Sequence, residues 1–442
     1  MTKHSLLRLF ACSLLCSTVP PVHSQSYTFA TLAGSPGAIG TNDGINHESR
    51  FNFPVGIAAD AVGNIYVADL LNHAIRKMTL SGTNWEVTTI AGLTGTSGYA
   101  DGTNSDARFN RPAGIAADTA GNVFVSERYN HTIRELTAVG TNWVVTTVAG
   151  HATVTGHDDG TNTDARFYLP SGIAVDSSNH IYVADAANFT IREIVQAGTN
   201  WVVSTIAGSV TNYGFVDGPN LEALFDYPYD VAVSKSGKLY VADWGNDAIR
   251  EISRSGTNWI VATIAGFSGA FGTNDGSGSI ASFYSPAGIA VDSTGNLFVA
   301  DQYNNTVRML APGQTDWIVS TVAGQALKAG SADGLGTNAL FKRPWGIAVD
   351  NKDRLFVTDY ANSTIRGGMA LVSSAPVLQI SISDNQVVLV WPISAANYIL
   401  ETATDLGPGA SWLPLKTGVV MVGDRMFFTN KLSASASFFR LH

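Results

Sequence analysis

A stretch at residues 112–134 recurs six times along the chain and constrains the fold more than any other feature. Its central aspartate and its closing arginine both return at one constant spacing along the whole array. A fixed period without insertions indicates one structural unit repeated side by side. The aspartate positions are Asp60, Asp118, Asp176, Ser234, Asp292 and Asp350, and the arginines are Arg76, Arg134, Arg192, Arg250, Arg308 and Arg366.

Each unit has the pattern of four short antiparallel strands joined by tight turns. In the second copy the apolar runs are separated by glycine- and asparagine-containing turns, which is typical of a twisted meander. Such a meander is the usual blade of a β-propeller. The expected strands are residues 114–118, 123–125, 133–136 and 143–150, and residues 150–167 lead to the next blade.

The two ends of the array predict a closed ring. Residues 27–34 match the fourth strand alone, and the sixth copy at residues 341–366 supplies only the first three strands. We therefore expect the N-terminal strand to lie beside the strand that contains Ile365 and complete the sixth blade, which removes two exposed sheet edges. The fold class is all-β: a six-bladed β-propeller closed by the N-terminal strand, with a small C-terminal β-sandwich-like domain.

Three motifs of the unit resemble the NHL repeat. They read Pro-x-Gly-Ile-Ala-x-Asp, Gly-Asn-Ile-Tyr-Val-Ala-Asp and Asn-His-x-Ile-Arg, and the resemblance covers about residues 27–370 in six copies. It implies a six-bladed propeller, and its Asp-Gly lead-in is common in secreted bacterial versions. It does not specify a function, because propellers serve binding, scaffolding and catalysis alike.

The N-terminus has the pattern of a signal peptide over residues 1–24. Lys3 precedes a mainly apolar run at residues 6–15, Arg8 lies near the start of that run, and small residues follow at a plausible cleavage site. Both cysteines, Cys12 and Cys16, lie inside this segment, so the mature chain would have no disulfide. A lipid anchor on Cys16 is the competing interpretation, but the bulky Leu15 fits it poorly.

We expect a secreted, periplasmic or cell-surface protein without a membrane span. A spanning helix needs an apolar run of about 18 residues or more, and no stretch of the chain approaches that length.

After the propeller at residues 25–370 the pattern changes. Residues 371–376 are typical of a linker, and residues 377–442 predict a small β domain similar to fibronectin-like modules. Its expected strands are residues 378–382, 387–391 and 398–402, followed by apolar segments at 426–428 and 438–441.

The charge balance argues against nucleic acid as a partner. The chain has 26 basic and 35 acidic residues, a net charge of −9. Nucleic-acid binding depends on basic surface that neutralises phosphates.

Residues present in every copy are interpreted as structural. The carboxylates that end the second strand, from Asp69 to Asp359, precede the repeated arginines at a constant spacing and predict buried ion pairs. The Asp-Gly corners could suggest calcium, but turn formation already explains them. Tryptophans at the start of the fourth strand could stack on sugars, and packing between blades is the favoured alternative. These are Trp85, Trp143, Trp201, Trp259 and Trp317.

Residues that differ between copies are interpreted as functional. They flank the repeated proline and follow the repeated carboxylate, positions that open on one face of a propeller beside its channel, and Phe53 and Tyr360 are among them. Asp230 replaces a glycine found in the other five blades and stands beside Tyr229, although it could simply cap a turn. Aromatic and arginine side chains are typical of binding faces. The candidate ligand-binding residues are Tyr229, Asp230, Trp244, Tyr227, Arg111, Arg128, Tyr129, Tyr303, Arg343 and Trp345.

These observations favour an exported module that binds or scaffolds a glycan, peptide or protein. The alternative is a metal-assisted lyase or lactone hydrolase with its site at the propeller axis, as in similar six-bladed rings. Histidine occupies the Asn-His position only at His73 and His131, so a three-histidine set cannot be assembled from equivalent positions. We therefore assign no catalytic residue and no cofactor. A third alternative is a structural domain of a cell-surface assembly.

Overall fold

A computed structural model describes residues 26–267 and 269–371 and, beyond them, 379–383, 386–392, 400–403, 411, 413–415, 419–422, 425–431 and 438–441. The chain divides into two compact units at the Ala370/Leu371 boundary. Each is described by itself. Within the described residues no helix has the length and apolar character needed to cross a membrane.

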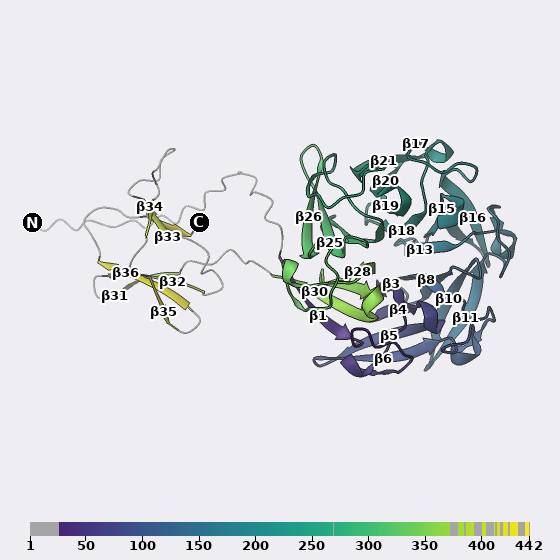
Figure 1. Cartoon of the computed structure of the whole chain (residues 1–442), viewed down its shortest axis with the longest axis horizontal. Helices are drawn as coiled ribbons and strands as arrows, with labels where there is room; N and C mark the ends of the chain where they lie inside the picture. The colour runs from purple at the N-terminus through teal and green to yellow at the C-terminus, as the bar shows by residue number, and fades with distance from the viewer. Residues whose placement is uncertain are drawn as a thin grey trace, which may run out of the picture. The chain divides into compact units, whose positions relative to one another are not determined.

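The first unit is a ring of six antiparallel sheets whose innermost strands neighbour one another in a closed circle, β3, β8, β13, β18, β23 and β28 (Figure 1). We number the blades one to six by these strands. The predicted six-bladed propeller is therefore confirmed.

Blade one comprises β2 (Gly44–Ile45), β3 (Pro54–Ala59), β4 (Ile65–Asp69), β5 (Ala74–Ser81) and β6 (Asn84–Ala91). Blade two comprises β7 (Gly102–Thr103), β8 (Pro112–Ala117), β9 (Val123–Glu127), β10 (Thr132–Val139) and β11 (Asn142–Ala149). Blade three comprises β12 (Gly160–Thr161), β13 (Pro170–Val175), β14 (Ile181–Asp185), β15 (Thr190–Ala197) and β16 (Asn200–Gly208).

Blade four comprises β17 (Gly218–Pro219), β18 (Pro228–Val233), β19 (Leu239–Asp243), β20 (Ala248–Ser255) and β21 (Asn258–Gly266). Blade five comprises β22 (Gly276–Ser277), β23 (Pro286–Val291), β24 (Leu297–Asp301), β25 (Thr306–Pro312) and β26 (Trp317–Gly324). Blade six comprises β27 (Gly334–Leu335), β28 (Pro344–Val349), β29 (Leu355–Asp359), β30 (Thr364–Ala370) and β1 (Tyr27–Ala33).

Short 3-10 turns complete the blades. In the lead-in segments they are η1 (Asn46–Glu48), η3 (Asn104–Asp106), η4 (Asn162–Asp164), η6 (Asn220–Glu222) and η8 (Gly336–Asn338). At the corners after the second full strand they are η2 (Leu70–Asn72), η5 (Ala186–Asn188), η7 (Trp244–Asn246) and η9 (Tyr360–Asn362).

Ring closure follows the sequence prediction. β1 pairs antiparallel with β30, with Thr28 opposite Met369 and Ala33 opposite Ile365. Tyr27 stands where the other blades have tryptophan, and its ring packs edge-on against Phe298 at 5.6 Å between centroids. The N-terminal strand thus completes both the sheet and the packing between blades five and six.

Each blade has a fifth strand that the sequence analysis did not predict. The Asp-Gly corner pairs with the outer edge of the tryptophan-bearing strand, as in Gly44 opposite Val87, so this strand is fourth and not outermost. The physical reason is the aspartate of the corner. Asp43 Oδ1 accepts hydrogen bonds from Arg76 Nη2 at 2.8 Å and from Thr89 Oγ1 at 2.9 Å, which holds the lead-in against β6.

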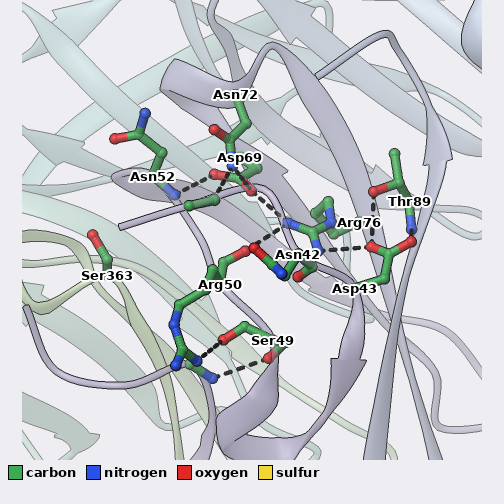
Figure 2. Close-up of polar contacts among 12 residues, drawn as sticks. Asn42, Asp43, Ser49, Arg50, Asn52, Asp69, Asn72, Arg76, Thr89 and Ser363 are labelled. Carbon is green, nitrogen blue, oxygen red and sulfur yellow. Dashed lines mark hydrogen bonds and ion pairs between the residues drawn. The ribbon is translucent and has the colours of Figure 1, made fainter. Parts of the chain in front are cut away.

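The repeated arginine is the centre of a buried network in every blade, and Figure 2 shows it in blade one. Arg76 Nη1 donates to Asp69 Oδ2 at 2.8 Å, and both side chains are 0% exposed. Asp69 also accepts from the backbone N–H of Asn52 and from the Asn72 amide, each at 2.8 Å. The predicted ion pairs are therefore present, at 2.7 to 3.0 Å in all six blades.

Packing between blades accounts for the repeated tryptophans. Trp143 of blade two meets the Tyr66 ring of blade one edge-on at 5.8 Å, and Trp259 of blade four meets Tyr182 of blade three at 6.1 Å. Trp143 is 9% exposed and Trp259 is 6% exposed, so neither offers a face to solvent. Of the two alternatives raised from sequence, packing between blades is the one this geometry fits.

The second unit contains two small sheets. One has the order β31 (Gln379–Ser383), β32 (Gln386–Pro392), β36 (Arg425–Lys431) and β35 (Val419–Val422); the other has β34 (Leu413–Pro414), β33 (Leu400–Ala403) and β37 (Phe438–Leu441). The predicted signal peptide, and the predicted linker apart from Leu371, lie outside the described residues.

Candidate ligand-binding face

The candidate site is built at the end of the ring where the second strands stop and the first strands begin. Each blade presents there the corner after its second strand and the residue after its repeated proline. Because the innermost strands form a closed circle, the side chains at these positions converge on one axis. These two positions differ between copies, so each blade contributes different side chains to this end of the ring.

Tyr229 crosses this axis. It follows Pro228 in β18 of blade four, and its ring stacks on Trp244 at 4.9 Å and on Trp345 of blade six at 5.6 Å. Its hydroxyl accepts a hydrogen bond from Arg128 Nη2 of blade two at 3.0 Å. Tyr229 is only 9% exposed, so its ring covers the end of the channel.

Further aromatic rings extend this stack on both sides. Trp345 contacts Tyr360 at 5.0 Å, and Trp244 contacts Tyr303 at 6.3 Å. We call the five rings of Tyr229, Trp244, Tyr303, Trp345 and Tyr360 the mouth cluster. They come from blades four, five and six, and four of the five belong to blades four and six, which are not adjacent. All except Tyr229 are partly exposed.

Sequence reasoning missed several members of this surface. Tyr360 and Phe53 lie at variable positions but were not in the candidate set, and their rings are 4.8 Å apart. Tyr284 and Phe271 continue the surface beyond Tyr303, at 5.0 and 4.6 Å from ring to ring. The repeat alignment marks the first two as variable, which is a usable signal. Phe271 lies in a lead-in segment that has no fixed motif at that position.

Three candidate arginines lie over rings at the same face, and we call them the mouth arginines. The guanidinium of Arg111 is 4.4 Å from the Tyr129 ring centroid, that of Arg343 is 5.1 Å from Tyr303, and that of Arg128 is 5.0 Å from Tyr229. None of the three forms an ion pair with a carboxylate in the described part of the chain.

All three mouth arginines influence the pKa of one hydroxyl, that of Tyr360. Burial raises the pKa of the Tyr360 hydroxyl, and the positive charges of Arg343, Arg111 and Arg128 act in the opposite direction. Coulomb interactions fall with distance and with screening, so the influence of these three arginines on Tyr360 agrees with their position at the same face.

Tyr227 lies apart from the mouth cluster. It precedes Pro228 with a φ of 48°, the left-handed region, and its ring meets Phe189 edge-on at 5.2 Å. Phe189 in turn contacts Tyr213 at 5.5 Å. Every residue before a repeated proline has this left-handed backbone, and in blade four it directs the tyrosine toward blade three.

The two histidines at the Asn-His position have a structural contact. His73 Nδ1 accepts the backbone N–H of Arg111 at 3.1 Å, and His131 Nδ1 accepts that of Leu169 at 3.2 Å. Burial lowers the pKa of both imidazoles, which keeps this acceptor nitrogen unprotonated. Asp247 and Asn305 accept the equivalent N–H groups in later blades.

Asp230 lies against the axial channel and not on the outer surface. It lines a cavity of about 70 Å³ together with Tyr229, Trp345 and the first strands of all six blades, enough for a few water molecules. Its oxygens accept the N–H groups of Val231 at 2.9 Å and of Ile289 in blade five at 3.0 Å. Burial raises its pKa to about 7, and these two N–H groups limit the rise.

The fold and this face define the class of protein: a six-bladed β-propeller whose channel is covered by aromatic rings and bordered by arginines. The NHL repeat family model matches residues 109–136, 167–194, 283–308 and 341–367. The chain therefore contains NHL repeats within its six-bladed propeller.

Curated relatives share the repeat region. The chain is 29% identical over 288 residues to Protein SUPPRESSOR OF QUENCHING 1, chloroplastic, of Arabidopsis thaliana, covering 63% of this chain and 26% of that protein. It is 27% identical over 305 residues to human NHL repeat-containing protein 2, covering 61% and 40%. It thus spans less than half the length of these relatives.

Solved structures share the fold. A protein of unknown function from Bacteroides thetaiotaomicron aligns with a TM-score of 0.58 at 20% identity, covering 78% of this chain and 76% of that one. An auxiliary nutrient binding protein from the same organism aligns with a TM-score of 0.56 at 16% identity, with the same coverage.

Proposed function

We propose that this protein is an exported ligand-binding propeller that recognises its ligand on the mouth face. The observation that carries the proposal is the convergence of the residues that depart from the repeat. Arg128, Tyr229 and Trp345 come from blades two, four and six, yet they form one contact set across the axis. An aromatic surface with arginines at its edge is the composition that binding sites enrich.

The ligand we propose is a glycan, peptide or protein outside the cytoplasm. The export part depends on residues 1–24 acting as a cleaved signal peptide. We also propose that residues 371–376 are a linker before a small β domain at residues 377–442. One solved propeller of this fold is described as an auxiliary nutrient binding protein, so the fold is compatible with ligand capture. N-terminal sequencing of the exported chain tests the cleavage.

The metal-assisted lyase or lactonase is the weaker alternative. Within the described residues no three His, Cys, Asp or Glu side chains lie together as a metal site would require. The axial carboxyl, Asp230, accepts two backbone N–H groups, and among the described residues that line its cavity there is no other acidic residue and no histidine. We therefore propose binding and not hydrolysis.

The test is Trp244→Ala on an array of glycans and peptides. Trp244 supports Tyr229, so we expect binding of whatever the parent recognises to weaken at least tenfold, because central aromatic residues contribute roughly 2 kcal/mol or more. The matched control is Val62→Ser, in the exposed turn between β3 and β4 at the other end of the blade. Equal binding by all three proteins, with unchanged thermal unfolding, would place the ligand elsewhere.

A further inference from the structure

The mouth arginines differ from every other arginine of residues 26–371 in how their guanidinium groups are used. The six repeated arginines each bind two carboxylates, as Arg76 binds Asp69 and Asp43. Arg254 and Arg354 bind Glu193 and Asp350. Arg50, Arg108 and Arg166 donate to backbone carbonyls of their own lead-in segments.

Arg111, Arg128 and Arg343 have none of these partners. Arg128 donates one hydrogen bond, to the Tyr229 hydroxyl, and the guanidinium groups of the other two lie over aromatic rings. A guanidinium that stacks on a ring uses its flat face and leaves its in-plane N–H groups directed outward. Those N–H groups match the two oxygens of a carboxylate or sulfate in a bidentate arrangement.

Acidic residues of the same face do not neutralise these arginines. Asp247 accepts the backbone N–H of Ser285 at 2.7 Å, and burial raises the pKa of Asp226. Both belong to blade four, whereas the arginines belong to blades two and six. One side of the mouth is therefore positively charged, on a chain whose net charge is −9.

The aromatic surface beside the arginines is partly exposed. Trp345 stacks on Tyr229, Tyr303 lies beside Trp244 under the Arg343 guanidinium, and both remain partly accessible. Rigid rings of this kind offer a large contact area at low entropic cost. A pyranose ring presents an apolar face of C–H groups that can lie on such a surface while its acidic group reaches an arginine.

Resting on the proposed binding function, we propose that the mouth face binds an acidic oligosaccharide. Its carboxylates or sulfates engage Arg111, Arg128 and Arg343, and its sugar rings lie against the exposed parts of Trp345 and Tyr303. Nucleic acid is the less favoured ligand because three arginines on an acidic chain release few counterions. An acidic peptide satisfies the arginines but leaves the aromatic surface without a rigid partner.

The experiment is calorimetric titration of the full chain. The probes are short galacturonate oligosaccharides, the matching neutral galactose oligosaccharides, a sulfated chondroitin fragment, a poly-glutamate peptide and a short single-stranded RNA. We expect acidic oligosaccharides to bind, neutral ones to bind at least tenfold more weakly, and affinity to fall as salt is raised. The ratio of galacturonate to sulfated binding distinguishes the two sources of the acidic group.

The test variants are Arg343→Gln alone and with Arg111→Gln, both of which leave the Tyr229–Arg128 bond in place. Each should weaken acidic-oligosaccharide binding about ten- to hundredfold, since a charge-assisted hydrogen bond is lost. The matched controls are Lys235→Gln and Lys352→Gln, which remove an exposed positive charge from hairpin turns at the opposite end of the blades. Those controls should keep the parent affinity.

The outcomes separate this inference from the function on which it rests. Preferred binding of poly-glutamate or RNA overturns the acidic-oligosaccharide proposal. Neutral ligands that depend on Trp244 but not on the arginines also overturn it, and they leave the binding function standing. A parent chain that binds none of the probes, and nothing on the wider array, overturns both.

Discussion

The buried ion-pair networks and the mouth face are made from the same repeat and have opposite properties. In the networks, Arg192 Nη1 lies 2.8 Å from Asp185 Oδ2 in blade three, and Arg250 Nη1 lies 2.7 Å from Asp243 Oδ2 in blade four. At the mouth, one position of the repeat is Arg128 in blade two and Trp244 in blade four. One region is copied six times, and in the other region the blades differ.

This difference separates stability from recognition. The carboxylates that end the second strands and the repeated arginines are buried, and each pairs with groups of its own blade. The mouth residues contact residues of other blades, as Tyr229 of blade four contacts Trp345 of blade six. A side chain that every blade needs cannot distinguish one ligand from another, and a side chain that only one blade has is not required for the repeat to fold.

The largest expected effect comes from removing the strand that both regions depend on. Deletion of residues 26–33 from the mature chain leaves β30 and β27 without their partner and removes the buried rings of Tyr27 and Phe29. We expect loss of cooperative thermal unfolding and aggregation through the new edges. Circular dichroism against the chain that starts at residue 25 is the measurement, and a sharp transition in the shortened protein would contradict ring closure.

A second change removes the buried ion pair of one blade. Asp185→Ala leaves Arg192 buried with Asp159 as its one remaining carboxylate, and we expect about 3–5 kcal/mol of destabilisation, as for other broken buried pairs. Denaturant unfolding measures it. The control is Glu251→Gln, whose partner Lys238 is 46% exposed and whose loss should cost less than about 1 kcal/mol. Similar losses in the two variants would remove the distinction between buried and surface pairs.

A third change, whose effect appears only as the pH is raised, converts blade four to the common pattern. Asp230→Gly restores the residue of the other five blades. In the parent the pKa of Asp230 is raised to about 7, so the neutral carboxyl contributes stability at low pH, and that contribution is lost as pH rises toward 7. Relative to the parent, the variant should gain up to about 4 kcal/mol between pH ~4 and pH ~8.

The measurement is the difference in stability between the parent and the Asp230→Gly variant at each pH. The six corner carboxylates are present in parent and variant, so their own titration cancels when thermal unfolding of both is followed across the same pH range. At low pH the variant should be slightly less stable, because Ile289 loses its acceptor. A parallel pH dependence in the two proteins would show that folding does not raise the pKa of Asp230.

Most of the fold could be predicted from the chain alone, and the site only in part. The constant spacing of the repeated aspartates and arginines identified the blades, and residues 27–34 identified the closing strand. The fifth strand was missed because so short a segment gives no periodicity. Its signal lay instead in Asp43, whose contact with Arg76 joins segments far apart in the sequence.

The sequence by itself determined which residues are equivalent, since equivalence is a matter of period. Only the tertiary structure decided which of the unlike residues meet. Tyr227 and Tyr229 are two positions apart, yet one lies against Phe189 and the other crosses the axis to Trp345 and Arg128. Such contacts depend on the closed ring, which brings blades two, four and six around one channel. A local sequence pattern cannot predict contacts between segments so far apart in the chain.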